Sequence, residues 1–422
     1  MKINKTTLPN GLRVITVPMK EAPTVTMLVM VEAGSKYETK DISGLSHFLE
    51  HMCFKGTKKR PNAIDLSREL DAIGAQYNAF TSQEYTGYYA KSHPKHINKL
   101  VDVISDMYVN PIFKAEEIEK EKGVIVQEIL MYEDMPHRHV NDVYMSLLHG
   151  DQPAGWNIAG TTELVKSFTR DHFIAYRNKH YVASGTVVVV AGNFNEKKIL
   201  ADIKKAFAKM SAAEKYTKIP VTEKQDAAAA RVVQKKTDQT HMVIATRSFP
   251  VGDKRIPALK VLDAVLGGGM SSRLFQKLRD DLGICYYVRA GSNEYTDHGD
   301  FAIATGVDST RVKVAIDAIL AECKKLTEKL VSPSELAKAK EHLIGGLYLG
   351  LESSDAIAEF SSFQEILRRT IQNPEQYARQ IQAVTAAQVR AVARDIFIEK
   401  HLNLAIVGNV ANEQELKDAL KF

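Results

Sequence analysis

The chain is poor in cysteine and has no long hydrophobic run, although it is 422 residues long. Its three cysteines, Cys53, Cys285 and Cys323, form no C-x-x-C motif and no paired framework, which favours a reducing compartment. No apolar run reaches about 18 residues, so the sequence predicts no membrane span. The first residues, MKINKTTLPNGLRVITV, lack the apolar core and cleavage site of a secretion signal. We therefore expect a cytoplasmic protein with no membrane partner.

A strong charge of one sign is also missing. The formal net charge of +5 is small for this length, and no Lys/Arg-rich run carries interleaved aromatic residues. A nucleic-acid partner is therefore not expected. With 45% hydrophobic and 25% charged residues, the composition is that of a soluble globular protein, and the length indicates two or more domains.

The two halves of the sequence resemble each other. The stretches TVVVVAGNF (186–194) and LNLAIVGNV (402–410) both read as a strand that ends in Gly-Asn. Between the halves, residues 216–230 are polar and mixed, which is typical of a linker. We predict an α+β fold of two similar, duplicated α/β sandwich domains (1–215 and 231–422), each a mostly antiparallel sheet packed with helices.

Hydrophobic periodicity predicts the elements of both halves. Strands are expected over 12–17, 24–31, 185–191 and 242–246, and hairpins over 75–92 and 285–307. Helices are expected over 62–73, 95–109, 114–132, 137–149, 196–210, 256–266, 271–281, 311–329, 333–347 and 355–369.

One short motif carries the chemistry. Residues 47–51 read HFLEH, so on a helix His47 and His51 lie one turn apart on the same face and can bind one metal ion. Glu50 leans toward the same side, where it can take a proton from a water on the metal. This H-x-x-E-H is the inverted form of the zincin motif. The alternative is a chance pattern on a solvated helix face, but the flanking residues are apolar.

The second half has the same apolar frame without the motif, because His47 corresponds to Lys260 and Glu50 to Asp263. Only the first half is therefore expected to bind metal. A catalytic zinc needs a third protein ligand, which should be a carboxylate or histidine on a neighbouring element.

Residues 119–133, EKEKGVIVQEILMYE, are the best source of that ligand. Glu121 and Glu128 lie two helical turns apart and share a face. Glu128 has apolar neighbours, among which a bare carboxylate is costly unless a cation is present. The alternative of a solvated helix face suits Glu119 but not Glu128.

In these residues the chain resembles the pitrilysin/insulinase family of zinc metallopeptidases. The short two-domain form, similar to mitochondrial processing peptidase subunits and their bacterial homologues, matches nearly end to end. The matching segments are the NGLR start, H-x-x-E-H, NAFTSQEYTGYY, the distant glutamate pair and SSRLFQKLRDDLGICYYV. The resemblance implies a zinc endopeptidase that cleaves unfolded peptides or presequence-like segments.

The family pattern also implies roles at the metal. One Zn²⁺ per chain would be held by His47, His51 and Glu128. Glu50 would be the general base, and Glu121 would have a catalytic or supporting role beside the ligands.

The family pattern further implies where the substrate binds. Asn78, Ala79, Phe80 and Thr81 match the strand to which an extended peptide adds by main-chain hydrogen bonds. Phe54, Phe80 and Trp156 are candidate walls of side-chain pockets, and the alternative for each is an ordinary core aromatic.

Arg279 and Tyr286 match a family pair that binds substrate and stabilises the oxyanion. The alternative is an arginine at a helix end and an ordinary strand tyrosine. Relatives enclose a chamber with four such domains, so we expect a homodimer whose sites combine one protomer's metal ligands with the other's Arg279 and Tyr286. The competing hypothesis is a non-catalytic structural or partner subunit. Such relatives typically lose zinc ligands or the glutamate base, whereas this chain keeps both.

Overall fold

The computed structural model describes residues 1–422 and divides into two compact units. The first unit comprises Met1–Ile129, Asn157–Ile219 and Leu349–Asn373, and the second comprises Leu130–Trp156, Pro220–Tyr348 and Pro374–Phe422. Each unit therefore contains one segment from the other half of the sequence. The predicted domains, 1–215 and 231–422, are contiguous and do not include these segments.

The first unit is built on a six-stranded sheet with the order β1-β2-β6-β3-β5-β4. Its strands are β1 (Asn4–Thr7), β2 (Arg13–Pro18), β3 (Val25–Val31), β4 (Gln76–Thr81), β5 (Thr86–Ser92) and β6 (Thr186–Gly192). Every neighbouring pair is antiparallel except β2 and β6, which are parallel. Strand β4 lies at one edge of the sheet, so one side of its backbone has no strand partner.

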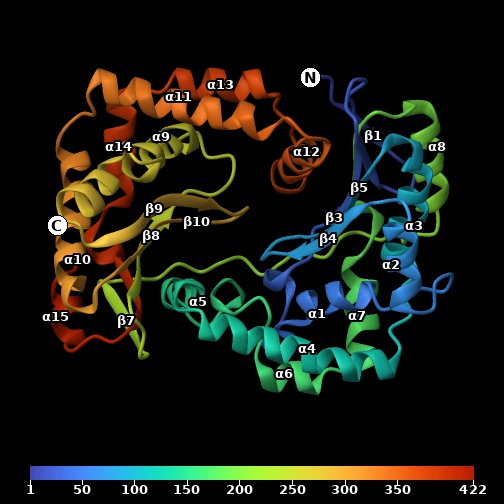
Figure 1. Cartoon of the computed structure of the whole chain (residues 1–422), viewed down its shortest axis with the longest axis horizontal. Coiled ribbons are helices and arrows are strands. Elements are labelled where there is room, and N and C mark those ends of the chain that lie inside the picture. The colour runs from blue at the N-terminus through green and yellow to red at the C-terminus, as the bar shows by residue number, and fades with distance from the viewer. The chain divides into compact units, whose positions relative to one another are not determined.

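Alternating apolar side chains let this sheet bury both faces. On one face Val14 and Met27 belong to a core shared with several helices of the unit, whereas Ile15 and Leu28 point to the other face. The helices of the first face include α1 (Leu45–Cys53), α2 (Ala63–Asp71), α3 (Ile97–Val109), α7 (Arg170–His180) and α8 (Glu196–Ala206). The second face is covered by α12 (Ser354–Arg368), which comes from the second half of the sequence (Figure 1).

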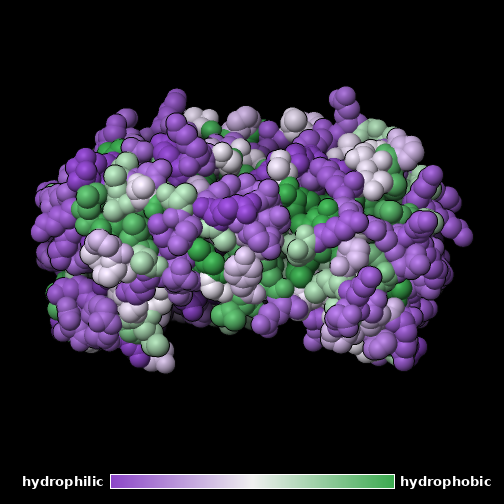
Figure 2. Space-filling model, turned by 90° about the horizontal axis from the view of Figure 1, so that it is seen from above, coloured by the Kyte–Doolittle hydropathy of each residue, from purple (hydrophilic) through white to green (hydrophobic).

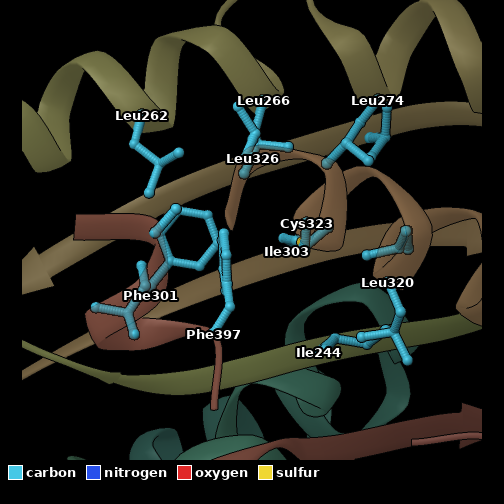
Figure 3. Close-up of a cluster of buried hydrophobic side chains, with 14 of the residues drawn as sticks. Ile244, Leu262, Leu266, Leu274, Phe301, Ile303, Leu320, Cys323, Leu326 and Phe397 are labelled. Carbon is cyan, nitrogen blue, oxygen red and sulfur yellow. The ribbon is translucent and has the colours of Figure 1, made fainter. Parts of the chain in front are cut away.

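The second unit is built on a five-stranded sheet with the order β7-β11-β8-β10-β9. Its strands are β7 (Ala229–Gln234), β8 (Thr240–Ser248), β9 (Cys285–Glu294), β10 (Gly299–Val307) and β11 (Asn403–Gly408), and only β7 and β11 are parallel. Helices α9 (Ile256–Gly267), α10 (Val312–Glu328) and α14 (Ala386–Ile396) cover one face. Figure 3 shows Leu262 and Leu266 of α9 above Phe301 of β10 in this core.

The opposite face of the second sheet is covered by α5 (Pro136–His149), from the first half of the sequence. Each of the two sheets has one parallel pair of strands, a run of antiparallel strands and one covering helix that comes from the other half of the sequence. This repeated plan, with helices packed on both faces of two mostly antiparallel sheets, confirms the predicted α+β fold.

The remaining helices are α4 (Ala115–Asp134), α6 (Thr162–Ser167), α11 (Pro333–Gly350), α13 (Pro374–Gln382) and α15 (Glu413–Asp418). Most expected helices begin and end within a few residues of the observed ones. The helix expected over 271–281 is helical over 273–281, but Phe275–Asp281 of it is a π-helix and not an α-helix. The helix expected over 196–210 ends early, at Ala206.

None of the helices combines the length and apolar character that a membrane span requires. The face seen in Figure 2 is mostly hydrophilic, with smaller hydrophobic areas between the polar side chains. The apolar side chains gather instead in buried clusters on the faces of the two sheets.

Candidate metal centre

The motif helix α1 is fixed at its beginning by a buried carboxylate. Glu38 accepts the backbone N–H groups of Gly44 at 2.8 Å and Ser46 at 2.6 Å, two donors that a helix start leaves without partners. Gly44 has φ of +98°, and a Cβ there would lie 2.5 Å from the carbonyl oxygen of Ala159, so no other residue fits. These contacts fix the position and start of α1 in the first unit.

The apolar side of α1 enters the core, where Phe48, Leu49 and Met52 are fully buried. His47 and His51 lie on the remaining face, with their ring centroids 4.7 Å apart. Because residues four apart share a helix face, the packing of the apolar positions aims both imidazoles at the same space.

Helix α4 brings a carboxylate to this space. Oε2 of Glu128 lies 3.8 Å from Nε2 of His47 and 3.6 Å from Nε2 of His51. All three ligand atoms lie within 4.8 Å of one another. Tetrahedral zinc bonds of about 2.0–2.1 Å would place ligand atoms roughly 3.3 Å apart, so the observed spacing fits one ion after a small adjustment. Two histidines and one glutamate are also a donor set of catalytic zinc sites, which leave a fourth position open.

The two histidines differ electrostatically. Burial, helped by the neighbouring His51, lowers the pKa of His47 to about 4 and keeps it neutral, the form that binds metal. Burial also acts to lower the pKa of His51, but its hydrogen bond to Glu121 and the nearby carboxylates outweigh this, and its pKa is raised. Three acidic groups around two imidazoles make the site attractive to a cation.

Glu50 is buried beside the ligands on α1. Burial raises its pKa, against the opposing effect of a hydrogen bond from Thr81, whose Oγ1 donates to Oε2 of Glu50 at 2.5 Å. Thr81 is the last residue of β4. The strand at the sheet edge therefore holds the carboxylate that the sequence assigns as the base.

Glu121 lies behind His51 and away from the three ligand atoms. Its Oε1 is 2.9 Å from Nδ1 of His51, and its Oε2 is 2.5 Å from Nζ of Lys55. Burial acts to raise the pKa of Glu121, but the hydrogen bonds from His51 and Lys55 lower it overall. An ionised carboxylate here accepts the Nδ1–H of His51 and leaves its Nε2 lone pair free for a metal.

The open edge of β4 presents specific backbone groups. The N–H of Ser82 bonds to the carbonyl oxygen of Tyr85, so even-numbered residues face β5 and odd-numbered residues face the open edge. Accordingly, the N–H of Ala79 is not paired with β5 and donates instead to the side-chain Oδ1 of Asn78 at 2.9 Å. The backbone of Ala79 and Thr81 is thus available to an added strand.

The candidate pocket residues lie in different places. Phe54 follows α1 and is half-buried, with its ring centroid 6.5 Å from that of Tyr88. The ring of Phe80 lies over Gly87 and beside Phe363 of α12, which is the sheet face opposite α1. Trp156 belongs to the second unit, where its Nε1 donates to Asp151 at 2.9 Å. Phe54 and Phe80 therefore lie on opposite faces of the first sheet and do not form one wall.

Arg279 and Tyr286 lie together in the second unit. The guanidinium donates to the backbone oxygen of Tyr286 and lies 4.7 Å from the centroid of its ring. Tyr286 is 72% exposed, so its hydroxyl group is open to a ligand. Arg279 lies in the π-helical segment, a distortion that is frequent at functional sites.

The second unit carries a counterpart of the metal centre without its ligands. On α9, Asp263 accepts the hydroxyl of Ser292 at 2.5 Å, as Glu50 accepts that of Thr81. Lys260, which replaces His47, binds Glu294 and donates to the Ser292 carbonyl at 3.1 Å. In the second unit the ammonium group of Lys260 therefore supplies the positive charge that a metal ion would supply in the first.

Comparison with known proteins agrees with this geometry. Residues 13–162 match the Insulinase (Peptidase family M16) model, and residues 167–343 match that of the Peptidase M16 inactive domain. An uncharacterised zinc protease of Bacillus subtilis, YmxG, is 35% identical over 97% of this chain and 99% of its own length. The chain belongs to peptidase family M16. An uncharacterised zinc protease of Streptomyces coelicolor is 33% identical over 99% of this M16 chain and 92% of its own length.

Solved structures show the same M16 fold. A protease from Helicobacter pylori has a TM-score of 0.89 at 22% identity, over 96% of this chain and 99% of its own. A chain of Complex III2 from Candida albicans has a TM-score of 0.86 at 18% identity, over the full length of both chains. Because proteins named so differently share this fold, the side chains of the site have to carry the functional argument.

Three contacts of the site were missed by sequence reasoning. The side chains that make these contacts are those of Lys55, Thr81 and Glu38. Their residue types are ordinary for turns, strands and loops. Lys55 alone had a signal, because it lies four residues after His51 on the same helical face.

Proposed function

We propose that this M16 chain is a zinc-dependent endopeptidase that hydrolyses unfolded peptides or presequence-like segments. The observation that carries the proposal is the convergence of His47, His51 and Glu128 on one point, with the carboxylate of Glu50 beside them on the same helix. Curated relatives named zinc proteases support zinc as the metal. The one group of three ligand residues supports the proposal of one ion per chain.

The chain's own residues perform the proton transfers in this proposal. A zinc ion held by His47, His51 and Glu128 would supply Lewis acidity, which would polarise the scissile carbonyl and make a water more acidic. An oxygen of Glu50 accepts a proton from the attacking water as the water oxygen forms a bond to the carbonyl carbon. The same carboxyl group then returns the proton to the amide nitrogen as the C–N bond breaks. Burial, which raises the pKa of Glu50, makes it a stronger base than an exposed glutamate.

Peptide binding is proposed at the edge of β4. An extended peptide would pair with the outward backbone groups of Ala79 and Thr81 and displace the side chain of Asn78 from the Ala79 N–H. Main-chain hydrogen bonds do not distinguish between side chains. The proposal therefore fits unfolded substrates of many different sequences. Arg279 and Tyr286 would donate to the developing oxyanion.

The assembly proposed for this activity is a homodimer that encloses a chamber. It would contain four sheet-based units and two equivalent sites. Each site would combine the metal ligands of one protomer with Arg279 and Tyr286 of the other.

The decisive experiment combines metal analysis with peptide cleavage mapped by mass spectrometry. We expect about one zinc per chain and cleavage of many unfolded peptides. Glu50→Gln should keep the zinc, because the ligands remain, and lose activity by roughly 10²-fold or more, because the proton acceptor is gone. Glu128→Gln should instead release the metal, whereas Glu116→Gln, an exposed carboxylate of the same helix, should change neither property.

Two results would contradict the proposal. Full activity of Glu50→Gln would show that another group is the base. A zinc-loaded wild-type protein that cleaves no member of a broad peptide panel would favour the competing function, a structural or partner subunit without catalysis.

A further inference from the structure

His51, the second histidine of the metal centre, contacts the carboxylate of Glu121, and this carboxylate has a second partner. Glu121 is 4% exposed, and its two oxygens face different groups. Oε1 lies 2.9 Å from Nδ1 of His51, and Oε2 lies 2.5 Å from Nζ of Lys55. The carboxylate therefore bridges a ligand ring and an ammonium group.

Local geometry delivers Lys55 to this position. Helix α1 ends at Cys53, but the N–H of Lys55 still bonds to the carbonyl oxygen of Met52, so Lys55 continues the turn below His51. At Gly56 the backbone turns away with φ of +127°, where a Cβ would lie 2.5 Å from the carbonyl oxygen of Pro61. Lys55 is thus the last residue of this turn that can reach α4.

The other histidine ligand has no such support. Nδ1 of His47 is buried and has no hydrogen-bond partner. The ring orientation of His47 rests on packing alone, whereas that of His51 depends on the position of the Glu121 carboxylate. A buried carboxylate is itself stable in one position only when its charge is paired.

We propose that Lys55 is a positioning residue of the metal centre, which holds Glu121 against Nδ1 of His51 and so keeps Nε2 of His51 aimed at Glu128. Lys55 touches neither metal nor peptide and acts through two intervening side chains. The inference deepens the proposed function, because it concerns the same site and rests on metal binding there.

Metal affinity is the property that tests this role. Zinc dissociation constants are measured by chelator competition, with every variant made in the Glu50→Gln background so that activity plays no part. Lys55→Met removes the ammonium group but keeps most of the stem, and we expect it to weaken zinc binding by about 10-fold or more. Lys55→Arg should stay close to the parent, because it keeps a cation that a carboxylate can bind. Lys58→Met is the matched control, an exposed lysine three residues further on, and should change nothing.

A double-mutant cycle shows whether Lys55 acts through Glu121. Glu121→Gln should weaken zinc binding, and adding Lys55→Met to it should cause almost no further loss. A parent-like affinity of Lys55→Met, or losses that multiply in the double variant, would overturn the inference. Lys55→Gln provides a second test if Lys55→Met does not reach the native circular dichroism spectrum.

The results also separate this inference from the proposed peptidase function. If the wild type cleaves peptides and Lys55→Met binds zinc as tightly as its parent, only the role of Lys55 fails. If zinc binding depends on Lys55 through Glu121 but no peptide is cleaved, only the peptidase function fails.

Discussion

His180 shows how strongly single buried residues of the first unit are set by their surroundings. It is 2% exposed in the last turn of α7, and its ring lies against Tyr176, with centroids 4.2 Å apart. Tyr37 and Tyr216 contact the same ring edge-on. Burial, together with the charge of Lys179, lowers the pKa of His180 to about 4.

This shift predicts a loss of stability in acid. An unfolded histidine has a pKa of about 6.5, so the unfolded chain takes up the proton first. The stability contribution is complete above that pH and is lost as the pH falls toward 4, by at most roughly 3 kcal/mol. His180→Phe keeps a ring among the tyrosines and cannot titrate. Urea unfolding of zinc-free protein between pH 4 and 7 should show a flatter pH dependence in this variant, and equal slopes in both proteins would contradict the assignment.

At the residue scale, the sequence could predict what local spacing determines. His47 and His51 share a face because a helix repeats every 3.6 residues, and Glu128 stood out as a carboxylate among apolar neighbours. The contact of Thr81 with Glu50, which are 31 residues apart, depends on how separate segments of the chain pack. No local pattern encodes such contacts, so only the structure could show them.

At the scale of elements, β4 is the edge strand at which substrate binding is proposed. Its outward N–H groups have no strand partner, and at Ala79 the side chain of Asn78 takes the place of one. An edge strand of this kind is a template for a further strand.

Ala79→Pro tests the template directly. Proline removes the outward N–H but breaks no bond to β5, which an edge position tolerates. We expect KM to rise by about tenfold for many peptides, with zinc content unchanged. Ala79→Gly is the control, because it keeps the N–H and removes only the methyl group. An unchanged KM across a peptide panel would exclude strand addition at this residue.

Elements were predictable where apolar periodicity is strong, as in 95–109 and 311–329, which became α3 and α10. The sequence did not predict α13 and α14, and it placed the start of β7 (Ala229–Gln234) in a polar linker. Helices α5 and α12 were expected, but not their positions. Periodicity shows that a helix has an apolar face, and it does not show which of two similar sheets that face covers.

At the scale of the whole molecule, the two units have the same arrangement of strands and helices, as expected from duplication, but only the first unit has a metal centre. Lys260 and Asp263 take the positions of His47 and Glu50, and the ion pair of Lys260 with Glu294 supplies a cation from within the chain. The second unit instead contains Arg279 and Tyr286, which contact each other. The two functional sets therefore lie in different compact units.

Complementation decides whether the two sets act within one chain or between two. Glu50→Gln and Arg279→Ala should each be nearly inactive alone. If the chain forms the proposed homodimer, about half of the dimers are hybrids after verified exchange of protomers at equal amounts. In the shared-site arrangement each hybrid has one intact site, which combines the metal ligands and Glu50 of one protomer with Arg279 of the other.

About a quarter of wild-type activity should therefore return in the mixture. If Arg279 serves the metal centre of its own chain, every site in the mixture keeps one damaged residue, and no activity returns. Mixing Glu50→Gln with Glu128→Gln is the control, because both changes damage the same metal centre and no pairing creates an intact site that contains both residues. Recovery in the first mixture and none in the second is the result that the shared-site dimer requires.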